Sequence, residues 1–154
     1  MPCPKCLENP GFHSFLFCGQ IRNTNLFFSC LAKSSDKNSD GTMLQNIIIH
    51  MTEDTKKKPW IWVLNCENMG LKDYTNIYFS IGLLKHLSKD PTLQDVWLIN
   101  SNLWIQTTFQ ILNSMSDAKF LKQIKIIDGS TLEKLDTFKK IGLDTKTAYW
   151  LISQ

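Results

Sequence analysis

The chain has 154 residues, a length typical of one domain. Its apolar fraction of 43% and charged fraction of 20% are ordinary for a globular protein and exclude disorder along the whole chain. The net charge of +3 is mildly basic, but Arg22 is the only arginine. Because arginine is preferred for bidentate contacts with bases and phosphates, we expect no sequence-specific nucleic-acid binding. The abundance of lysine, asparagine and isoleucine is typical of a protein encoded by an AT-rich genome.

The sequence has no apolar run approaching the roughly 18 residues of a membrane-spanning helix, so no transmembrane segment is expected. Residues 1–6 lack the apolar stretch of a signal peptide, which indicates a cytoplasmic protein. The chain contains five cysteines, an odd number. In a reducing compartment these favour free thiols or metal binding over disulfides.

Residues 1–33 are expected to form a Cys-containing N-terminal β-hairpin. Two short aromatic and apolar runs, residues 14–18 and 26–31, flank a turn-like stretch at 19–25. Both faces of the hairpin are apolar, so it should dock against a sheet or extend one. The polar stretch 33–41 then predicts a surface loop.

The N-terminus carries the sharpest chemical pattern. Cys3 and Cys6 have the CxxC spacing of two tetrahedral zinc ligands, and His13 with one more thiolate would complete a structural site. An extended strand carries Cys18 away from His13, whereas the hairpin folds Cys30 back beside it. Cys30 is therefore the preferred fourth ligand and Cys18 the alternative. One structural zinc is the only cofactor suggested, and the competing interpretation is a chance Cys pair with buried hairpin thiols.

Helical and strand patterns alternate in the next part of the chain, residues 42–143. Apolar residues at helical spacing predict helices over residues 42–52, 74–87 and 103–115. Apolar runs predict buried strands over residues 60–64 and 96–99, and residues 124–127 predict a third strand.

The C-terminal third contains further helix signals. Ser130 and Glu133 have capping-box spacing at the start of one more helix, which Gly142 should end. The tail, residues 144–154, is expected to pack back on the core. Alternating strands and helices predict an α/β fold with a mainly parallel sheet and helices on both faces, preceded by the hairpin. The whole chain, residues 1–154, would then be a single domain.

From Trp60 onward the order of features resembles the CRAL-TRIO family. The resemblance rests on a buried strand that runs into a glycine-containing turn (60–70), the strand 96–100 that ends in an Asn, and the segments 119–128 and 130–135. It covers about two thirds of the chain, residues 42–143, and indicates a divergent member. The chain departs from the family's pattern at residues 101–103 and 113–115, where proline-containing motifs are usual. A hairpin also replaces the family's upstream helical segment.

The resemblance implies a non-catalytic module that encloses a lipid or another hydrophobic ligand in an apolar pocket, gated by the helix at 103–115. The apolar side chains that it suggests as the lining are Phe79, Leu83, Leu84, Phe109, Leu112 and Met115. At helical spacing such residues are more often ordinary core. Divergent relatives also bind proteins, so the alternative is a protein-interaction module with a degenerate pocket. The hairpin face and the aromatic tail would then make the contact.

Two further features have a functional and a structural interpretation. Cys66 follows a predicted strand, where open α/β sheets place ligands, so a Cys-dependent enzyme is the third hypothesis. It needs a base within reach, and both His50 and His86 lie in predicted helices, which favours a simple strand-end thiol. No common catalytic signature occurs, so we expect no enzyme. Lysines 56–58 are interpreted as a solvated connector, with contact to acidic lipid headgroups as the alternative.

Overall fold

The structure is a computed structural model that describes residues 8, 14–30, 43–67, 77–103, 106–107, 110, 114 and 122–154. These residues form a five-stranded sheet in the sequential order β1-β2-β3-β4-β5. The strands are β1 (Leu16–Ile21), β2 (Thr24–Cys30), β3 (Trp60–Asn65), β4 (Leu93–Ile99) and β5 (Ile124–Ile127). β1 and β2 are antiparallel, and every later pair of neighbours is parallel. The predicted α/β fold with a mainly parallel sheet is confirmed, and the hairpin extends that sheet.

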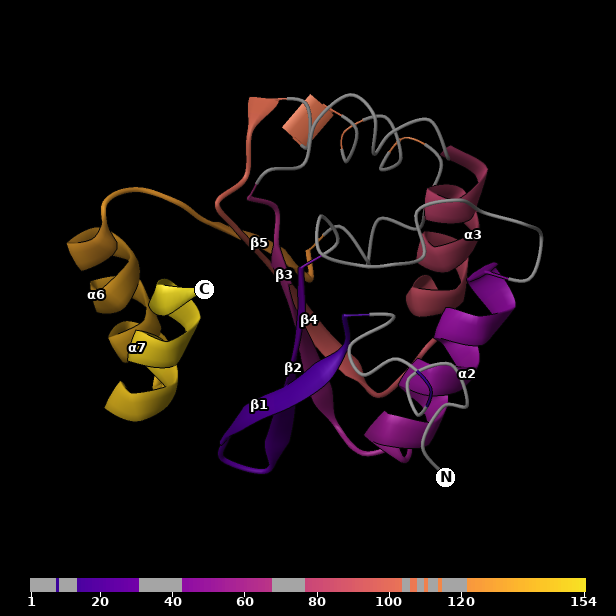
Figure 1. The fold of residues 1–154 in the computed structure, drawn as a ribbon, viewed down its shortest axis with the longest axis horizontal. Helices are drawn as coiled ribbons and strands as arrows, with labels where there is room; N and C mark the ends of the chain where they lie inside the picture. The colour runs from indigo at the N-terminus through magenta and orange to yellow at the C-terminus, as the bar shows by residue number, and fades with distance from the viewer. Residues whose placement is uncertain are drawn as a thin grey trace.

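Helices cover both faces of the sheet, as predicted. α2 (Met43–Thr55) and α3 (Ile77–Ser88) connect successive parallel strands and lie on one face (Figure 1). α6 (Thr131–Ile141) and α7 (Thr145–Ser153) follow the last strand and lie together on the opposite face (Figure 1). No described helix is long and apolar enough to cross a lipid bilayer. Because strand side chains alternate between the faces, the sheet supplies two separate cores.

The core under α2 and α3 is built around aromatic rings. Phe15 stacks on Phe27 with 4.8 Å between ring centroids, and both rings meet Trp60 edge-on. The indole N–H of Trp60 donates to Asp90 over 3.2 Å, and that of Trp62 donates to Ser29 Oγ over 2.8 Å. These two large side chains are therefore buried with their polar atoms paired, as is usual for a buried indole.

The core under α6 and α7 joins the hairpin to the C-terminal helices. The ring of Phe28 meets Trp150 edge-on at 5.1 Å, and Trp97 lies 6.1 Å from Phe138. Trp97 is fully buried, and so is Leu151 of α7. The C-terminal tail therefore packs back on the sheet as a helix, as the sequence predicted.

α6 begins and ends where the sequence places its signals. Ser130 Oγ accepts from the backbone N–H of Glu133, and the Glu133 carboxylate accepts from the N–H of Ser130, which completes the capping box. Gly142 ends the helix with a φ of 101°, a left-handed conformation that glycine adopts at little cost. α7 then begins at Asp144, whose side chain accepts from the N–H of Thr147.

The hairpin strands are longer than predicted. Ile21 pairs with Thr24, so only Arg22 and Asn23 form the turn. The turn is therefore shorter than the expected stretch at 19–25. Gly19 is therefore a strand residue. A Cβ atom there would lie 2.8 Å from Thr147 Cγ2, so glycine allows α7 to approach the hairpin closely.

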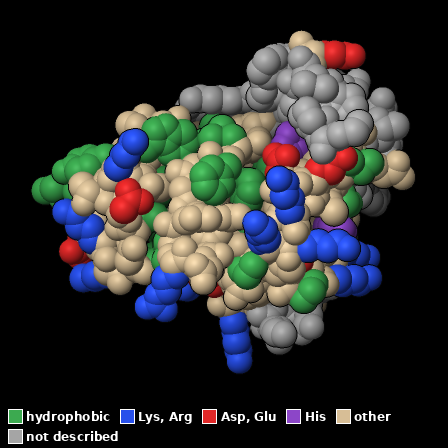
Figure 2. All heavy atoms as spheres, turned by 90° about the horizontal axis from the view of Figure 1, so that it is seen from below, with side chains coloured by type: hydrophobic (Ala, Val, Ile, Leu, Met, Phe, Trp, Pro, Cys, Tyr) green, Lys and Arg blue, Asp and Glu red, His purple; other side chains and the backbone are tan. Residues whose placement is uncertain are grey.

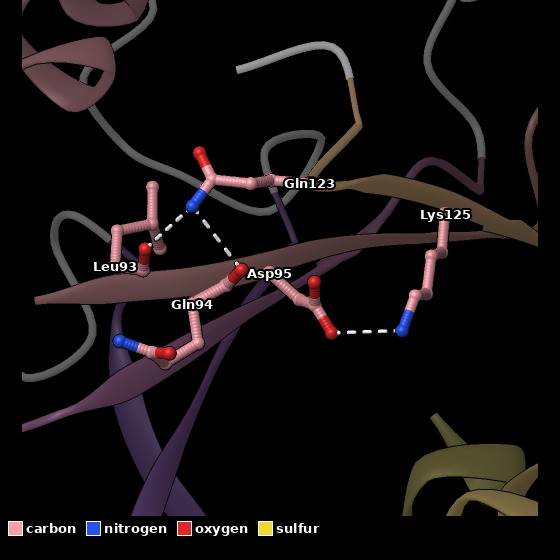
Figure 3. A network of polar contacts seen from close by, with 5 residues as sticks. All are labelled: Leu93, Gln94, Asp95, Gln123 and Lys125. Atoms are coloured by element: carbon pink, nitrogen blue, oxygen red, sulfur yellow. Dashed lines mark hydrogen bonds and ion pairs between the residues drawn. The ribbon is translucent and has the colours of Figure 1, made fainter. Parts of the chain in front are cut away.

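Strand β5 is short, and side chains hold it in register against β4 (Figure 3). Gln123 Nε2 donates to the carbonyl oxygens of Leu93 and Gln94 over 2.7 and 3.2 Å. Lys125 Nζ lies 2.9 Å from the Asp95 carboxylate. The register turns Lys125 to the α6/α7 face and Ile126 to the α2/α3 face, because Ile126 pairs with Leu98.

Two predicted helical regions are described only in part. In the segment 103–115, Leu103, Gln106, Thr107 and Gln110 have helical conformation. The N–H of Gln106 donates to the carbonyl oxygen of Asn102 over 3.0 Å, as a helix requires. The helix predicted from residue 74 is described from Ile77 onward as α3.

The contact between Gly19 and Thr147 should be measurable as a coupling energy. Gly19→Ala is expected to lower the free energy of unfolding by about 1–3 kcal/mol, because the added methyl group meets the Thr147 side chain. Urea unfolding of Gly19→Ala, Thr147→Ala and the double variant gives the coupling between the two positions. The double variant should lose less than the sum of the single losses. Strict additivity would contradict a steric contact at this position.

Candidate functional site

Three neighbouring parallel strands, β3, β4 and β5, have their carboxyl-terminal ends on the same side of the sheet. The loops that follow these strands carry polar residues. β3 ends at Asn65, Asn100 directly follows β4, and Asp128 directly follows β5. Open α/β sheets bind their ligands outside this carboxyl edge. The polar side chains here therefore form the first candidate site.

A chain of hydrogen bonds connects β3, β4 and α6 at this edge. Asn65 is fully buried, and its Oδ1 accepts from the N–H of Glu67 and from Asn100 Nδ2, both at 3.0 Å. Asn100 Oδ1 in turn accepts from Lys134 Nζ over 2.7 Å. We call Asn65, Asn100 and Lys134 the amide–lysine cluster.

Asn100 also has an unusual backbone conformation. Its φ of 53° lies in the left-handed region, which asparagine adopts more readily than most residues. The chain then brings Ser101 to Asp128: the Ser101 N–H and hydroxyl donate to the two carboxylate oxygens over 3.1 and 2.8 Å. Gln106 Nε2 adds a hydrogen bond to Ser101 Oγ at 3.1 Å. The loop after β4 is therefore fixed to the loop after β5.

Cys66, the thiol of the enzyme hypothesis, lies at the same edge but is fully buried. Burial raises the pKa of this thiol to about 12, and the charges of Asp128 and Cys30 add to that effect. A nucleophilic cysteine requires the opposite shift, toward the thiolate. His50 lies 2.9 Å from Asp54 within α2 and packs edge-on against Phe15.

The apolar lining set is described at one position. Leu83 is 5% exposed and packs in the core under α2 and α3. The side chains of Phe79 and Leu84, together with Phe109, Leu112 and Met115, lie outside the described part of the structure. The set as a ligand site therefore stays a prediction.

The sequence did not single out Ile126, an apolar residue on the α2/α3 face of the sheet. Its partner Leu98 is fully buried in the α2/α3 core, yet the Ile126 side chain is 51% exposed. The alternation of Ile124 and Ile126 on the last strand was visible in the sequence. Only the position of β5 at the sheet edge reveals the exposure.

Of the four proposed zinc ligands, only Cys30 is described; Cys3, Cys6 and His13 lie outside the described residues. The N–H of Cys30 donates to Ser14 Oγ over 2.7 Å, so the hairpin returns Cys30 to the start of β1, as the zinc hypothesis requires. Its thiol is buried in the core under α6 and α7. Among the described residues, no three Cys, His, Asp or Glu side chains are grouped as metal ligands. The zinc site stays a prediction.

Lysines 56–58 lie in the tight turn from α2 to β3, at the opposite end of the sheet. Lys56 and Lys57 have left-handed φ values of 51° and 57°, and the N–H of Lys58 donates to the carbonyl oxygen of Thr55 over 3.0 Å. All three side chains are exposed. In the view from this end, basic side chains are spread among apolar ones (Figure 2). The turn geometry fits the interpretation of lysines 56–58 as a solvated connector between α2 and β3.

The buried thiol of Cys66 should leave a signature at alkaline pH. Its pKa is about 12 in the folded protein and 9.0 when free, so the folded state holds the proton more tightly. This contribution to stability is complete below about pH 9 and is lost as the pH rises toward about 12. As the pH rises between these two values, the free energy of unfolding should fall less in Cys66→Ala than in the wild type. Urea unfolding at a series of pH values measures the difference. Parallel curves would contradict the buried, protonated thiol.

Two single substitutions test whether Cys30 or Cys18 is the fourth zinc ligand. We expect the purified protein to carry one zinc ion by native mass spectrometry and Cys30→Ser to lose it. Cys18→Ser should retain it, because Cys18 Sγ lies 3.5 Å from the Leu26 carbonyl oxygen, and burial raises its pKa to about 12. The reverse result would identify Cys18 as the ligand, and a metal-free wild type would remove the site.

Comparison with known families supports this architecture. The chain matches the sequence profile described as "Divergent CRAL/TRIO domain" over residues 21–148. The match begins at the end of β1 and reaches into α7, so it is wider than the expected 42–143. No curated protein matches the sequence. Because the profile spans most of the chain, including every parallel strand, the protein belongs to the divergent CRAL/TRIO domain family.

Proposed function

We propose that the protein is a non-catalytic module that binds a lipid or another hydrophobic ligand on the face of the sheet covered by α2 and α3. Its membership of the CRAL/TRIO family supports a hydrophobic ligand of this kind. The core on this face is aromatic and apolar, which suits contact with an acyl chain or ring system.

The observation that carries the proposal is the exposure of Ile126 beside that core. Ile124, on the same face of β5, is only partly buried against it, and Ile126 is 51% exposed. An apolar ligand that covers Ile126 would continue the core across the edge strand. Full burial of such a side chain is worth about 1.5–3 kcal/mol.

The non-catalytic part of the proposal is supported by the state of Cys66. The thiol is fully buried and its pKa is raised to about 12, so it is protonated at neutral pH. Cys66→Ser should therefore leave ligand binding intact. Cys18, Cys30 and Cys66 are all free thiols, which supports a reducing, cytoplasmic setting as part of the same proposal.

Ile126→Gln tests the ligand site directly. With a fluorescent fatty acid such as cis-parinaric acid as the probe, we expect its affinity to fall roughly tenfold or more. Leu132→Gln is the matched control, because Leu132 is 76% exposed on α6, which lies on the opposite face. Both are surface changes and should alter stability by no more than about 0.5 kcal/mol.

Equal binding by the two variants would contradict the proposed location of the ligand. Native and denaturing mass spectrometry of the wild type tests the function itself. An excess of several hundred daltons that is lost on denaturation is the expected result for a carried lipid. A bare mass together with no fatty-acid binding would contradict the proposal.

A bare mass would favour a protein-interaction module instead. Leu16 in the hairpin and Tyr149 in α7 are 43% and 55% exposed. The contact between Gly19 and Thr147 joins the two elements that carry them. These side chains are the apolar contacts that the hairpin and α7 would offer to a protein partner.

A further inference from the structure

We propose that the amide–lysine cluster binds a small oxyanion, a carboxylate or phosphate group, where the parallel strands end. Asn65 shares its row across the sheet with Cys30, Ile99 and Ile127, all of which pack on the α6/α7 face. The cluster therefore lies on the face opposite the proposed hydrophobic site. The two proposals can fail independently.

The first observation is an unpaired donor in a fully buried side chain. Asn65 has no exposed surface, and its Nδ2 has no hydrogen-bond partner among the described residues. Buried amide groups are nearly always hydrogen-bonded, and an exception indicates a missing ligand, ion or water. An unpaired N–H calls for an acceptor, and an oxygen atom is the commonest one.

The orientation of this amide is fixed by its neighbours. Asn65 Oδ1 accepts from the Glu67 N–H and from Asn100 Nδ2. Exchanging the oxygen and nitrogen would place Nδ2 against two other donors. Asn100 is fixed in the same way, because its Oδ1 accepts from Lys134 Nζ. The unpaired atom of Asn65 is therefore the nitrogen.

The cluster as a whole has more donors than acceptors. Within the part of the chain that the structure describes, the amide of Asn65 has two N–H groups without a partner, that of Asn100 one, and the ammonium group of Lys134 two. Oδ1 of Asn65 already accepts two hydrogen bonds. Asn100 and Lys134 are only partly buried, so solvent reaches the cluster from their side. An oxyanion supplies several acceptors and balances the lysine charge.

Two neighbouring carboxylates define how the ligand must be held. Asp128 accepts from Ser101, and Glu133 closes the capping box of α6, so both carboxylates are already hydrogen-bonded outside the amide–lysine cluster. Their charge opposes an anion at long range. Binding must therefore rest on direct hydrogen bonds, and it should persist when the ionic strength is held constant with sodium chloride.

The test is a titration of the full, isotope-labelled chain followed by the side-chain amide signals of Asn65 and Asn100. Sodium phosphate and sodium acetate are the free oxyanion probes, with sodium chloride at matched ionic strength as the reference. We expect a saturable shift of the Asn65 amide signal. Lys134→Met should weaken the affinity about tenfold or more.

Lys140→Met is the matched control, because Lys140 lies on the same helix, is exposed and pairs with Asp136 at 2.8 Å. It removes the same charge and should leave the affinity unchanged. Equal affinities of the two lysine variants, or an amide signal moved neither by the free anions nor by short-chain phosphatidic acid, would overturn the proposal. The cluster would then be a structural bridge that holds a water molecule.

Asn65→Asp provides a second, isosteric change. It replaces the unpaired donor by an oxygen, so it should abolish the response to both anions. If this variant does not fold, the comparison of Lys134→Met with Lys140→Met still decides the question. A further titration with a short-chain phosphatidic acid below its micelle concentration separates the sources of the oxyanion. Saturation by phosphate or acetate identifies a free anion, and saturation by the lipid alone identifies a headgroup.

Discussion

Strand β3 is paired on both edges and buried along its whole length, and the other elements are positioned around it. Its side chains alternate between the faces, so it supplies Trp60 and Trp62 to the core under α2 and α3 and Ile61 and Val63 to the core under α6 and α7. A strand of this kind has to be apolar on both faces. Any polar residue within it must find its partners inside the protein.

Asn65 is the polar residue at the end of β3, and its need for partners inside the protein accounts for the amide–lysine cluster. Its neighbours across the sheet, Cys30 and Ile99, are buried and apolar, so the amide is shielded from bulk solvent and needs polar partners nearby. Asn100 and Lys134 supply partners from the next strand and from α6. The polar cluster thus exists because a central strand ends in a buried amide. The hydrophobic site that we propose has a different origin, the exposed flank of an edge strand at Ile126.

Features that depend on local sequence were predictable. The continuous apolar runs indicated β3 and β4, and the spacing of Ser130 and Glu133 indicated the start of α6, because strand burial and helix caps are encoded within a few residues. The return of Cys30 to the start of the hairpin was also predictable, since a hairpin is a local closure.

Features that depend on contacts between distant segments were not predictable. The role of Gly19 required the position of α7, and the bond between Asn100 and Lys134 required the position of α6 beside β4. Alternating strands and helices indicate a parallel sheet, but they do not say which loops meet at its edge. The raised pKa of Cys66 likewise follows from burial by residues remote in sequence.

The docking of α7 on the hairpin has a consequence for biosynthesis. Ribosomes make the chain from its N-terminus at about 5–20 residues per second, so every strand is complete before α7 appears. Until then the core that holds Phe28 and Leu151 is incomplete, and the part of the sheet that α7 covers remains exposed beside α6. The nascent chain therefore exposes apolar surface on the hairpin, which α7 covers when it packs beside Gly19 on β1.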